Sequence, residues 1–597
     1  MRTQMMLKCN VCLGLVLVLL SFHAPSATGT SWWEKVDETV LAEVNKESCE
    51  FLVTLSVQAD LSHAASLTSK WEKGHYTVMT LKSVAARTQT PVVNALAATG
   101  VTYRTFWIAN MIWVRGDGAV LEMLASRDDV ARILANPRIR IPSSQAKPPV
   151  ERDEGFKSVE WNISHVNGPA VWSGGNIGQD AVVGGIDTGY EWDHPALMEQ
   201  YRGWDGITTD HDYNWHDAIH VGGGDCGANS PEPCDDNGHG SHTMGVMVGD
   251  DGGANQIGLA PGARWIGCRC MDQGYGTPAT FIECLEWMVA PYPLGGGSDE
   301  GDPSLAPDVI NNSWSCLPSV GCAWDTLLPV IENVRAAGIV VVASAGGNGP
   351  DCSSVLYPPE IYEASFTVGA TNSTDIVASF SGRGPVLVDG SGRLKPDVCA
   401  PGVAVRSSVL NGTYAFYSGA SMAAPHVAGL VALVVTANPG LAGDVDQLEL
   451  IITSSAVPLT SNQCGDGDDV PNNVYGHGRI DALAACTRAV VGVDEVTPGP
   501  DPTPASLRLL PNIPNPFNPV TTIAFELPEP SHVHLHIYDV SGRLVRVLLD
   551  GNYLGASRHE TIWYGEDESG HAVAAGIYFC RLDANGHALT QRLALIK

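Results

Sequence analysis

Three residues of this chain, Asp187, His239 and Ser421, carry the side chains needed for nucleophilic catalysis by serine. A serine hydroxyl is a poor nucleophile at neutral pH, so it needs a base that accepts its proton, and imidazole has a suitable pKa. The imidazole in turn needs a carboxylate that fixes its tautomer and stabilises its cation. We therefore treat the three residues as one hypothesis, in the chain order carboxylate, imidazole, hydroxyl.

Ser421 lies where a turn of small residues leads into an apolar segment, in the sequence Ser-Gly-Ala-Ser-Met-Ala-Ala-Pro-His-Val-Ala-Gly-Leu at 418–430. This pattern predicts a buried helix, and the N–H groups of a first helical turn favour a developing negative charge. Pro425 is expected in that first turn, where its missing N–H does no harm. An ordinary serine helix cap is the alternative interpretation.

The other two residues lie next to elements that are typical of a parallel sheet. The apolar run 181–186 predicts a buried strand that ends in Asp187, and His239 stands between two glycines ahead of a second predicted helix. In open α/β sheets, functional groups gather at the carboxyl ends of the strands. Alternating strands and helices across 157–486 predict an α/β domain with a mainly parallel sheet and helices on both faces.

Short motifs surround these residues and recur through the same segment. The first three are Asp187-Thr-Gly, Asn237-Gly-His-Gly-Ser-His242 and Gly419-Ala-Ser-Met-Ala-Ala-Pro-His-Val-Ala-Gly429. The others are Trp161-Asn-Ile, Pro169-Ala-Val-Trp172, His194-Pro-Ala-Leu197, Tyr201-Arg-Gly203, Tyr213-Asn-Trp215, Asn311-Asn-Ser-Trp314 and Lys395-Pro-Asp397. Together they resemble the subtilisin-like serine peptidases, and among these the bacillopeptidase F branch.

The resemblance implies a secreted serine endopeptidase that cuts protein or peptide substrates and needs no cofactor for its chemistry. Ser421 would attack the scissile carbonyl, His239 would act as general base and then as general acid, and Asp187 would orient His239. The family makes such enzymes as zymogens that remove their own inhibitory propeptide.

The resemblance also assigns the groups that would hold the substrate. Ser313, Trp314 and Ser315 align with the strand that pairs with the substrate backbone. The family supplies an oxyanion-hole asparagine, but a gapless alignment of Ser-Ala-Gly-Gly-Asn-Gly-Pro at 344–350 puts Gly347 in that place. We expect the loop to deliver Asn348 instead, with a role as a plain turn residue as the alternative.

Two further patterns raise the question of metals. His239 and His242 have the H-x-x-H spacing of a zinc pair, but without the glutamate of a zinc peptidase, and the family resemblance makes His242 structural. Asp466, Asp468 and Asp469 lie in one loop, where a structural calcium ion and a solvated acidic loop are the two alternatives.

The first 150 residues are expected to be removed from the mature protein. Residues 1–29 have the basic start, the short apolar run and the small residues of a signal peptide. Residues 30–150 predict a small α+β domain that resembles the family's βαββαβ propeptide, with strands near 51–57, 101–106 and 111–114, helices at 79–98 and 118–125, and a last short element at 130–134. A charged, proline-containing segment at 142–155 predicts an exposed cleavage region.

Composition agrees with export. The formal net charge of -31 argues against nucleic-acid partners, and after the signal peptide we expect no transmembrane segment. Most of the 15 cysteines fall between 226 and 486, and in an exported protein they predict disulfides. The pairs Cys226/Cys234, Cys316/Cys322 and Cys464/Cys486 are plausible bridges, although connectivity does not follow from sequence.

The last hundred residues differ from the rest in composition and in the pattern of apolar and polar residues. A proline-rich linker at 489–506 precedes residues 507–597, whose alternating apolar and polar runs predict a β-sandwich. Pro514-Asn-Pro-Phe-Asn-Pro519, Tyr538-Asp-Val-Ser-Gly-Arg543 and Gly576-Ile-Tyr-Phe579 resemble FlgD-like immunoglobulin-type domains and the sorting domains of type IX secretion. This resemblance implies contact with a secretion machinery or attachment to the cell surface.

Two other functions compete with the peptidase. One is a catalytically weak or inactive surface-binding protein built on a subtilase fold, which only the Gly347 departure favours. The other is an esterase that uses the same triad. The intact triad residues and a site suited to an extended peptide backbone favour the endopeptidase.

Overall fold

The computed structural model describes residues 31–43, 46–141, 158–317, 321–465, 469–491, 507–510, 512, 515–519, 521–554, 558–568 and 571–596. The chain forms two compact units, Met1–Val490 and Val491–Lys597, and each is considered by itself. The predicted signal peptide and nearly all of the predicted cleavage region and linker lie outside the described residues.

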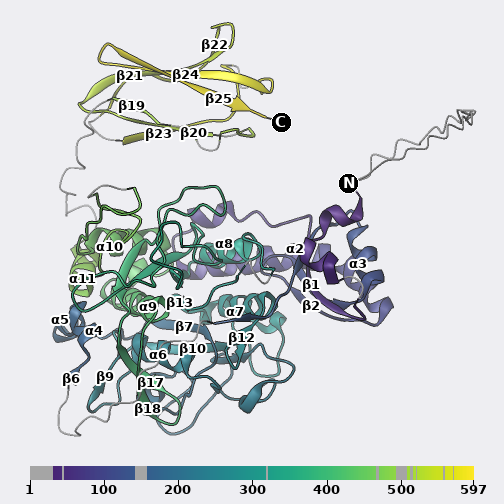
Figure 1. Ribbon diagram of the computed structural model, residues 1–597, viewed down its shortest axis with the longest axis vertical. Helices are drawn as coiled ribbons and strands as arrows, with labels where there is room; N and C mark the ends of the chain where they lie inside the picture. The colour runs from purple at the N-terminus through teal and green to yellow at the C-terminus, as the bar shows by residue number, and fades with distance from the viewer. Residues whose placement is uncertain are drawn as a thin grey trace, which may run out of the picture. The chain divides into compact units, whose positions relative to one another are not determined.

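The first unit is built around a seven-stranded sheet in which every neighbouring pair is parallel (Figure 1). In spatial order its strands are β16 (Val398–Pro401), β15 (Phe366–Thr371), β14 (Val340–Ser344), β13 (Val309–Asn312), β7 (Val182–Asp187), β10 (Arg264–Arg269) and β8 (Trp215–Asp217). All residues of β13, β14, β15 and β16 are buried, which is why the sequence shows continuous apolar runs here.

Helices cover both faces of this sheet. Successive residues of β13 point to opposite sides, because Val309 belongs to one apolar cluster and Ile310 to the other. The helices of the unit are α4 (Trp161–His165), α5 (Gly168–Ser173), α6 (His239–Val248), α7 (Pro278–Val289), α8 (Leu328–Ala336), α9 (Ala420–Ala437), α10 (Val445–Ser455) and α11 (Ala482–Val491). Apolar residues of α7 and α8 line the Ile310 side, and those of α6 and α9 line the Val309 side. The predicted α/β architecture is confirmed.

Helix α9 is the one described helix that is long and apolar enough to cross a membrane by length and composition. Its most apolar stretch is 83% buried inside the structure, and it packs against β13, β14, β15 and β16. It is therefore the central core helix of the domain.

Residues 31–141 form an α+β domain on the same unit. Its main elements are α1 (Glu38–Glu43), β1 (Cys49–Leu55), α2 (Lys70–Thr99), β2 (Thr102–Phe106), β3 (Met111–Gly116), α3 (Gly118–Ala125) and β4 (Val130–Ala135), with an antiparallel sheet ordered β2-β3-β1-β4. The predicted βαββαβ order is present. Helix α2 begins nine residues before its predicted start, because Ser69 and Glu72 form a capping box that stabilises a polar first turn.

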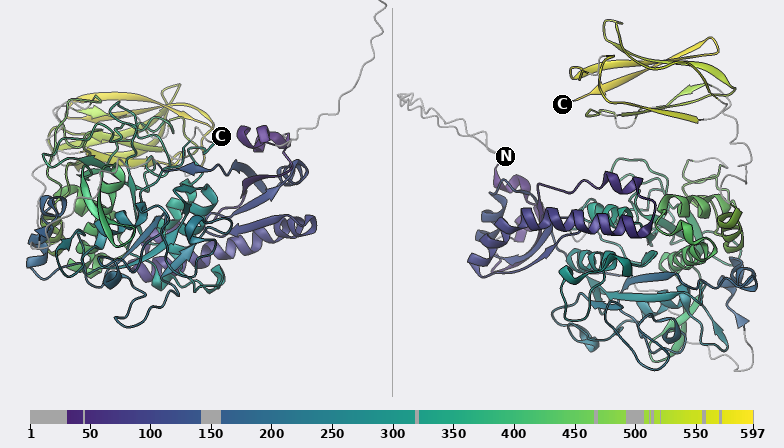
Figure 2. Two further views of the ribbon diagram at one scale, coloured as in Figure 1. Left: turned by 60° about the horizontal axis from the view of Figure 1, so that its bottom comes forward. Right: turned by 180° about the vertical axis from the view of Figure 1, so that it is seen from behind.

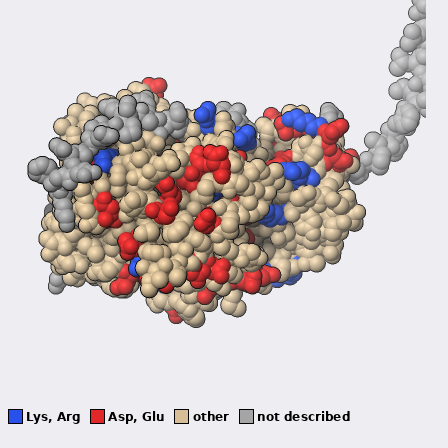
Figure 3. Space-filling model, turned by 90° about the horizontal axis from the view of Figure 1, so that it is seen from below, with Lys and Arg blue, Asp and Glu red and all other residues tan. Residues whose placement is uncertain are grey.

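This N-terminal domain packs against the sheet domain through α2, which lies alongside α8 (Figure 2). Lys70 Nζ lies 2.6 Å from Asp308 Oδ1, and Arg132 Nη1 lies 2.6 Å from Asp325 Oδ2. In both pairs the basic residue belongs to the N-terminal domain. Acidic side chains spread over the face drawn in Figure 3, in keeping with the net charge of -31.

Short strands complete the first unit. They are β5 (Ile139–Arg140), β6 (Ser158–Val159), β9 (Asn255–Gln256), β11 (Met271–Asp272), β12 (Tyr275–Gly276), β17 (Val405–Val409) and β18 (Thr413–Tyr417). Strand β5 belongs to the N-terminal domain but pairs with β12 of the sheet domain.

Four disulfides lie within the described residues, and they correct one predicted pairing. Cys226–Cys234 and Cys316–Cys322 are confirmed. Cys464 bonds to Cys352 rather than to Cys486, which is a free, buried thiol in α11. The fourth bridge, Cys268–Cys284, ties β10 to α7 and was not predicted.

The second unit is an antiparallel β-sandwich, as predicted. One sheet holds β19 (Arg508–Leu509), β20 (Thr521–Glu526) and β23 (Arg558–Trp563), and the other holds β22 (Leu544–Leu554), β21 (Ser531–Asp539), β24 (Gly576–Ala584) and β25 (His587–Leu595). Apolar residues from both sheets form its core, with Trp563 buried. Helix α11 continues through Val491, so the linker begins at least three residues after its predicted start at 489.

We expect a Cys352→Ser/Cys464→Ser double variant to lose about 4–5 kcal/mol of unfolding free energy, because this bridge closes a loop of 112 residues. Denaturant unfolding of the oxidised protein measures the loss. Cys486→Ala, which removes no bridge, is the control. Peptide mapping that joins Cys464 to Cys486 would contradict the assignment.

Candidate active site

Asp187 and His239 meet at the carboxyl end of the central sheet. Asp187 is the last residue of β7, and His239 is the first residue of α6. The Nδ1 atom of His239 lies 2.8 Å from Oδ1 of Asp187, and their side chains are only 4% and 1% exposed. The Asp187 carboxylate also accepts a hydrogen bond from the N–H of Thr188 at 2.8 Å. The two predicted residues are therefore brought together.

Asp235 fixes the relative position of this pair, and the sequence analysis missed it. Its Oδ1 accepts hydrogen bonds from the Thr188 hydroxyl at 2.9 Å and from the Gly238 N–H at 2.8 Å. Its Oδ2 accepts the hydroxyl of Ser241 at 2.7 Å. Asp235 thus joins the residue after Asp187 to the first turn of α6. The available clue was an acidic residue just before a predicted helix start, a position that favours carboxylates.

Electrostatics favour the charged form of His239. Burial alone lowers the pKa of His239, but the charge and the hydrogen bond of Asp187 outweigh it, and Asp235 adds to the effect, so the pKa is raised above its ordinary 6.5. A base whose cation is stabilised in this way can accept a proton from a hydroxyl group.

Ser421 is the second residue of α9, directly after the Gly419–Ala420 turn, as predicted. Pro425, however, lies in the second turn of the helix, so the prediction that it lies in the first turn is wrong. Proline has no N–H to donate to the carbonyl four residues earlier, which is that of Ser421. The hydroxyl of Ser313 donates to this carbonyl instead, at 2.9 Å.

The hydroxyl of Ser421 in turn donates to the carbonyl of Ser313 over a long 3.3 Å. Within the described residues, no hydrogen bond joins it to His239, although α6 and α9 pack against each other. Catalytic hydrogen bonds are often loose before a substrate is bound. Completion of the triad by Ser421 therefore stays a prediction.

The second histidine of the H-x-x-H motif faces the protein interior. His242 Nε2 lies 3.2 Å from the carbonyl of Val405, and its ring stacks on Tyr417. Burial, with the neighbouring His239, lowers the pKa of His242 to about 3, so the ring is neutral. These contacts fit the structural role that the family resemblance implies.

The loop expected to form the oxyanion hole is exposed at Gly347 and Asn348. A Cβ atom on Gly347 would meet nothing within 4 Å, and one on Gly346 would lie 3.5 Å from Asn348 Nδ2. No side-chain hydrogen bond of Asn348 is present among the described residues, so its role stays a prediction.

Residues 313–315 follow β13 rather than belong to it, because the strand ends at Asn312. Trp314 is buried, donates its indole N–H to the carbonyl of Ile186 at 3.1 Å and stacks on Phe281, so its side chain serves the core. The hydroxyl of Ser315 donates to the buried carboxyl group of Glu360 at 2.5 Å. Their backbone role in substrate binding stays a prediction.

A strand of the N-terminal domain pairs next to a turn that lies close to Asn237. Tyr275 and Gly276 of β12 pair with β5, and the N–H of Ile141 donates to the carbonyl of Gly274 at 3.0 Å. A Cβ atom on Gly274 would lie 3.0 Å from Asn237 Nδ2, two residues before His239. The end of the N-terminal domain therefore borders the candidate site.

The loop predicted to hold calcium is only partly described. Asp466 and Asp468 lie outside the described residues, and Asp469 is exposed, so calcium binding stays a prediction. In the part of the chain that the structure describes, one group of three His, Cys, Asp or Glu side chains is close enough to hold a metal ion, and it belongs to the second unit.

Comparison with known proteins supports both units. Residues 178–478 match the sequence model of the Subtilase family, and residues 513–597 match that of the Secretion system C-terminal sorting domain. The second match confirms the predicted sorting domain and marks the chain as a secreted protein, whereas the FlgD-like label stays a prediction.

Individual relatives agree with this picture. The chain is 35% identical to Bacillopeptidase F of Bacillus subtilis (strain 168) over 443 residues, which cover 71% of this chain and 29% of that protein. It is 34% identical to Serine protease AprX of the same organism over 277 residues, 42% of this chain and 58% of that protein. The chain thus spans less than two thirds of these two relatives. It is 31% identical to Subtilisin of Bacillus pumilus over 287 residues, 47% of this chain and 86% of that protein.

The family match covers half of the chain and includes Asp187, His239 and Ser421. It coincides with the parallel sheet domain, in which Asp187 and His239 meet at the carboxyl end of β7. The chain belongs to the subtilase family.

Proposed function

We propose that the protein is a serine endopeptidase that hydrolyses peptide bonds through Asp187, His239 and Ser421. The observation that carries this proposal is the buried hydrogen-bonded pair of Asp187 and His239 at the carboxyl end of β7. Ser421 at the start of α9, and relatives named as serine protease and subtilisin, support it further.

In the proposed reaction, His239 takes the proton of the Ser421 hydroxyl while the oxygen attacks the scissile carbonyl. Asp187 holds Nδ1 of His239, so Nε2 is the nitrogen left to act as base. The imidazolium then gives its proton to the leaving amine, and water releases the acyl group by the same route. No metal takes part in these steps.

We further propose that residues 30–150 act as an inhibitory propeptide. The pairing of β5 with β12 supports this, because an extended segment already occupies the edge of β12, and Gly274 just before β12 lies close to Asn237. Contacts away from the site add to it: Arg104 pairs with the buried Glu283, and the N–H of Ile108 donates to Glu286 at 3.0 Å.

A catalytically weak or inactive surface-binding protein is the alternative function. Two observations favour it, namely glycine at 347 and the absence, within the described residues, of a bond between Ser421 and His239. The esterase hypothesis has no such observation.

The deciding experiment compares the wild-type protein with Ser421→Ala after purification. We expect the wild type to lose the segment before residues 142–155 and to cleave casein, while the variant stays at full length, because it lacks the nucleophile. A gel and N-terminal sequencing measure this. Ser408→Ala is a matched control, since Ser408 lies in β17 and its hydroxyl donates to the carbonyl of Ser241.

If wild type and Ser421→Ala both stay at full length, and neither cuts casein after another protease removes the N-terminal domain, the peptidase proposal fails. The surface-binding alternative then takes its place.

The activity should depend on the neutral form of His239. Because the pKa of His239 is raised, kcat/KM for a short peptide amide should be low in acid and rise with pH, with a midpoint above 6.5. Asp187→Asn should lower kcat on the order of 10⁴-fold. Asp180 is exposed and lies just before the start of β7, so the control variant Asp180→Asn should leave kcat unchanged. A wild-type midpoint below 6.5 would contradict the assigned environment.

The oxyanion donor can be tested at two neighbouring positions. We expect Asn348→Ala to lower kcat roughly 10²–10³-fold with KM little changed. Adding Gly347→Asn to that variant should restore much of the loss, because open space surrounds a side chain at 347. Gly347→Ala in the same Asn348→Ala background adds a Cβ atom but no hydrogen-bond donor, so it should not restore the activity. Full activity of Asn348→Ala alone would exclude Asn348 as the donor.

A further inference from the structure

Three histidines stand in a row on strand β21 of the second unit. His532, His534 and His536 alternate with Val533, Leu535 and Ile537. The apolar residues are buried in the core of the sandwich, so the histidines line the opposite, outward face of the sheet. Nothing in the proposed peptidase chemistry or in the packing of the sandwich requires imidazoles at these positions.

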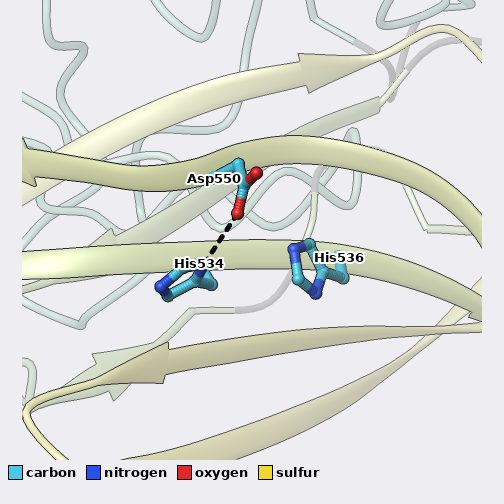
Figure 4. Close-up of side chains that lie close together, drawn as sticks. All are labelled: His534, His536 and Asp550. Atoms are coloured by element: carbon cyan, nitrogen blue, oxygen red, sulfur yellow. Dashed lines mark hydrogen bonds and ion pairs between the residues drawn. The ribbon is translucent and has the colours of Figure 1, made fainter.

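Two of these histidines converge with a carboxylate from the neighbouring strand. Asp550 of β22 lies opposite His534 in the strand register, and His534 Nδ1 is 3.0 Å from Asp550 Oδ1. The rings of His534 and His536 have centroids 6.0 Å apart. One potential ligand atom from each of His534, His536 and Asp550 lies within 4.8 Å of the other two (Figure 4).

The surroundings of His536 provide a second observation. Its Nε2 atom is buried and has no hydrogen-bond partner among the described residues, while its Nδ1 atom lies 3.3 Å from the Tyr538 hydroxyl. When Nδ1–H donates to the tyrosine oxygen, the lone pair of the neutral ring is on Nε2. A buried polar atom without a partner costs free energy, which a bound cation would offset. A hydrogen bond from the second ring nitrogen is also the usual arrangement around metal-bound histidines.

We propose that His534, His536 and Asp550 form a binding site for a divalent transition metal, with Zn²⁺ as the best fit. Two imidazole nitrogens and one carboxylate oxygen are ligands that Zn²⁺ prefers, and they leave a fourth position for water. Donor atoms in a tetrahedral zinc site lie about 3.3 Å apart. His534 Nδ1 and Asp550 Oδ1 are already 3.0 Å apart, and no two of the three donor atoms are more than 4.8 Å apart, so the widest pair needs to close by at most about 1.5 Å. Asp550 is 76% and His534 44% exposed at the side chain, which leaves them room to rotate.

The metal would join β21 to β22 across the face of the sheet and stabilise the sorting domain. The site holds no catalytic group of the triad, so this inference does not depend on the proposed peptidase activity. Without metal, the structure shows a His534–Asp550 ion pair and a contact between His536 and the Tyr538 hydroxyl, and a plain polar surface cluster is the competing explanation.

The test uses the full-length chain carrying Ser421→Ala, titrated with Zn²⁺ alone in a calorimeter and with Co²⁺ in an absorption spectrometer. We expect one site with bound Co²⁺ showing the d–d absorption of a tetrahedral N/O complex. Loss of an outer-shell partner typically weakens metal binding by about 10–100-fold, so His534→Ala and His536→Ala should each weaken it by at least that much. Zn²⁺ should also raise the unfolding temperature of the sorting domain, and a chelator should reverse the rise.

His532→Ala is the matched control, because His532 lies on the same strand and face but bonds to the carbonyl of Gly551 at 3.0 Å. It should keep the site. All three substitutions are at outward positions, and circular dichroism checks that the sandwich is intact. Equal Zn²⁺ affinity in the parent, His534→Ala and His536→Ala, or a parent that binds no Zn²⁺, overturns the proposal. Equal weakening by His532→Ala overturns the assigned ligand set.

Discussion

The hydrogen-bonded pair of Asp187 and His239 is the constraint on which the first unit depends. A carboxylate with almost no access to water is costly to bury unless hydrogen bonds and an opposite charge compensate for it. Here the imidazole and the N–H of Thr188 supply this compensation. The pair can form only if the end of β7 and the start of α6 are held in fixed positions. The neighbours β10 and β13, parallel to β7 on either side, fix the first of these.

The position of α6 is fixed by Asp235, which binds both Thr188 and the first turn of the helix. This carboxylate does two things at once, because it caps a helix terminus and orients the residue that follows Asp187. A change at Asp235 would therefore act on the orientation of His239 through two routes.

Ser421 is held in place by hydrogen bonds with Ser313. Pro425 leaves the carbonyl of Ser421 without its usual helical partner, and the hydroxyl of Ser313 fills the gap. The two serines exchange hydrogen bonds, so the end of β13 and the start of α9 are connected although they are 108 residues apart. In the proposed enzyme, these two hydrogen bonds join the segment that would bind the substrate backbone to the nucleophile.

The sequence predicted the elements of the sheet domain well, because buried parallel strands such as β7 and β13 are continuous apolar runs bounded by turn residues. It could not predict features that depend on which distant segments meet. Asp235 has the same local sequence whether or not Thr188 lies beside it, and Cys464 offers no local sign that its partner is Cys352 rather than Cys486. The prediction placed Pro425 one helical turn too early. The sequence does not show that the hydroxyl of Ser313 donates to the Ser421 carbonyl in place of the N–H that Pro425 lacks.

The N-terminal domain illustrates how such distant contacts bear on the proposed zymogen. Strand β5 is only two residues long, so its pairing with β12 supplies few hydrogen bonds. The body of the domain adds further contacts, through partly buried pairs such as Lys70 with Asp308 and through the N–H of Ile108 on Glu286. Burial raises the pKa of Glu286 to about 8, so this carboxyl group is mostly protonated at neutral pH while it is buried, and exposure to water would favour loss of the proton. In the proposed zymogen, cleavage after β5 would therefore free this strand from β12 without breaking the contacts of the body, and the domain would leave only when those contacts fail as well.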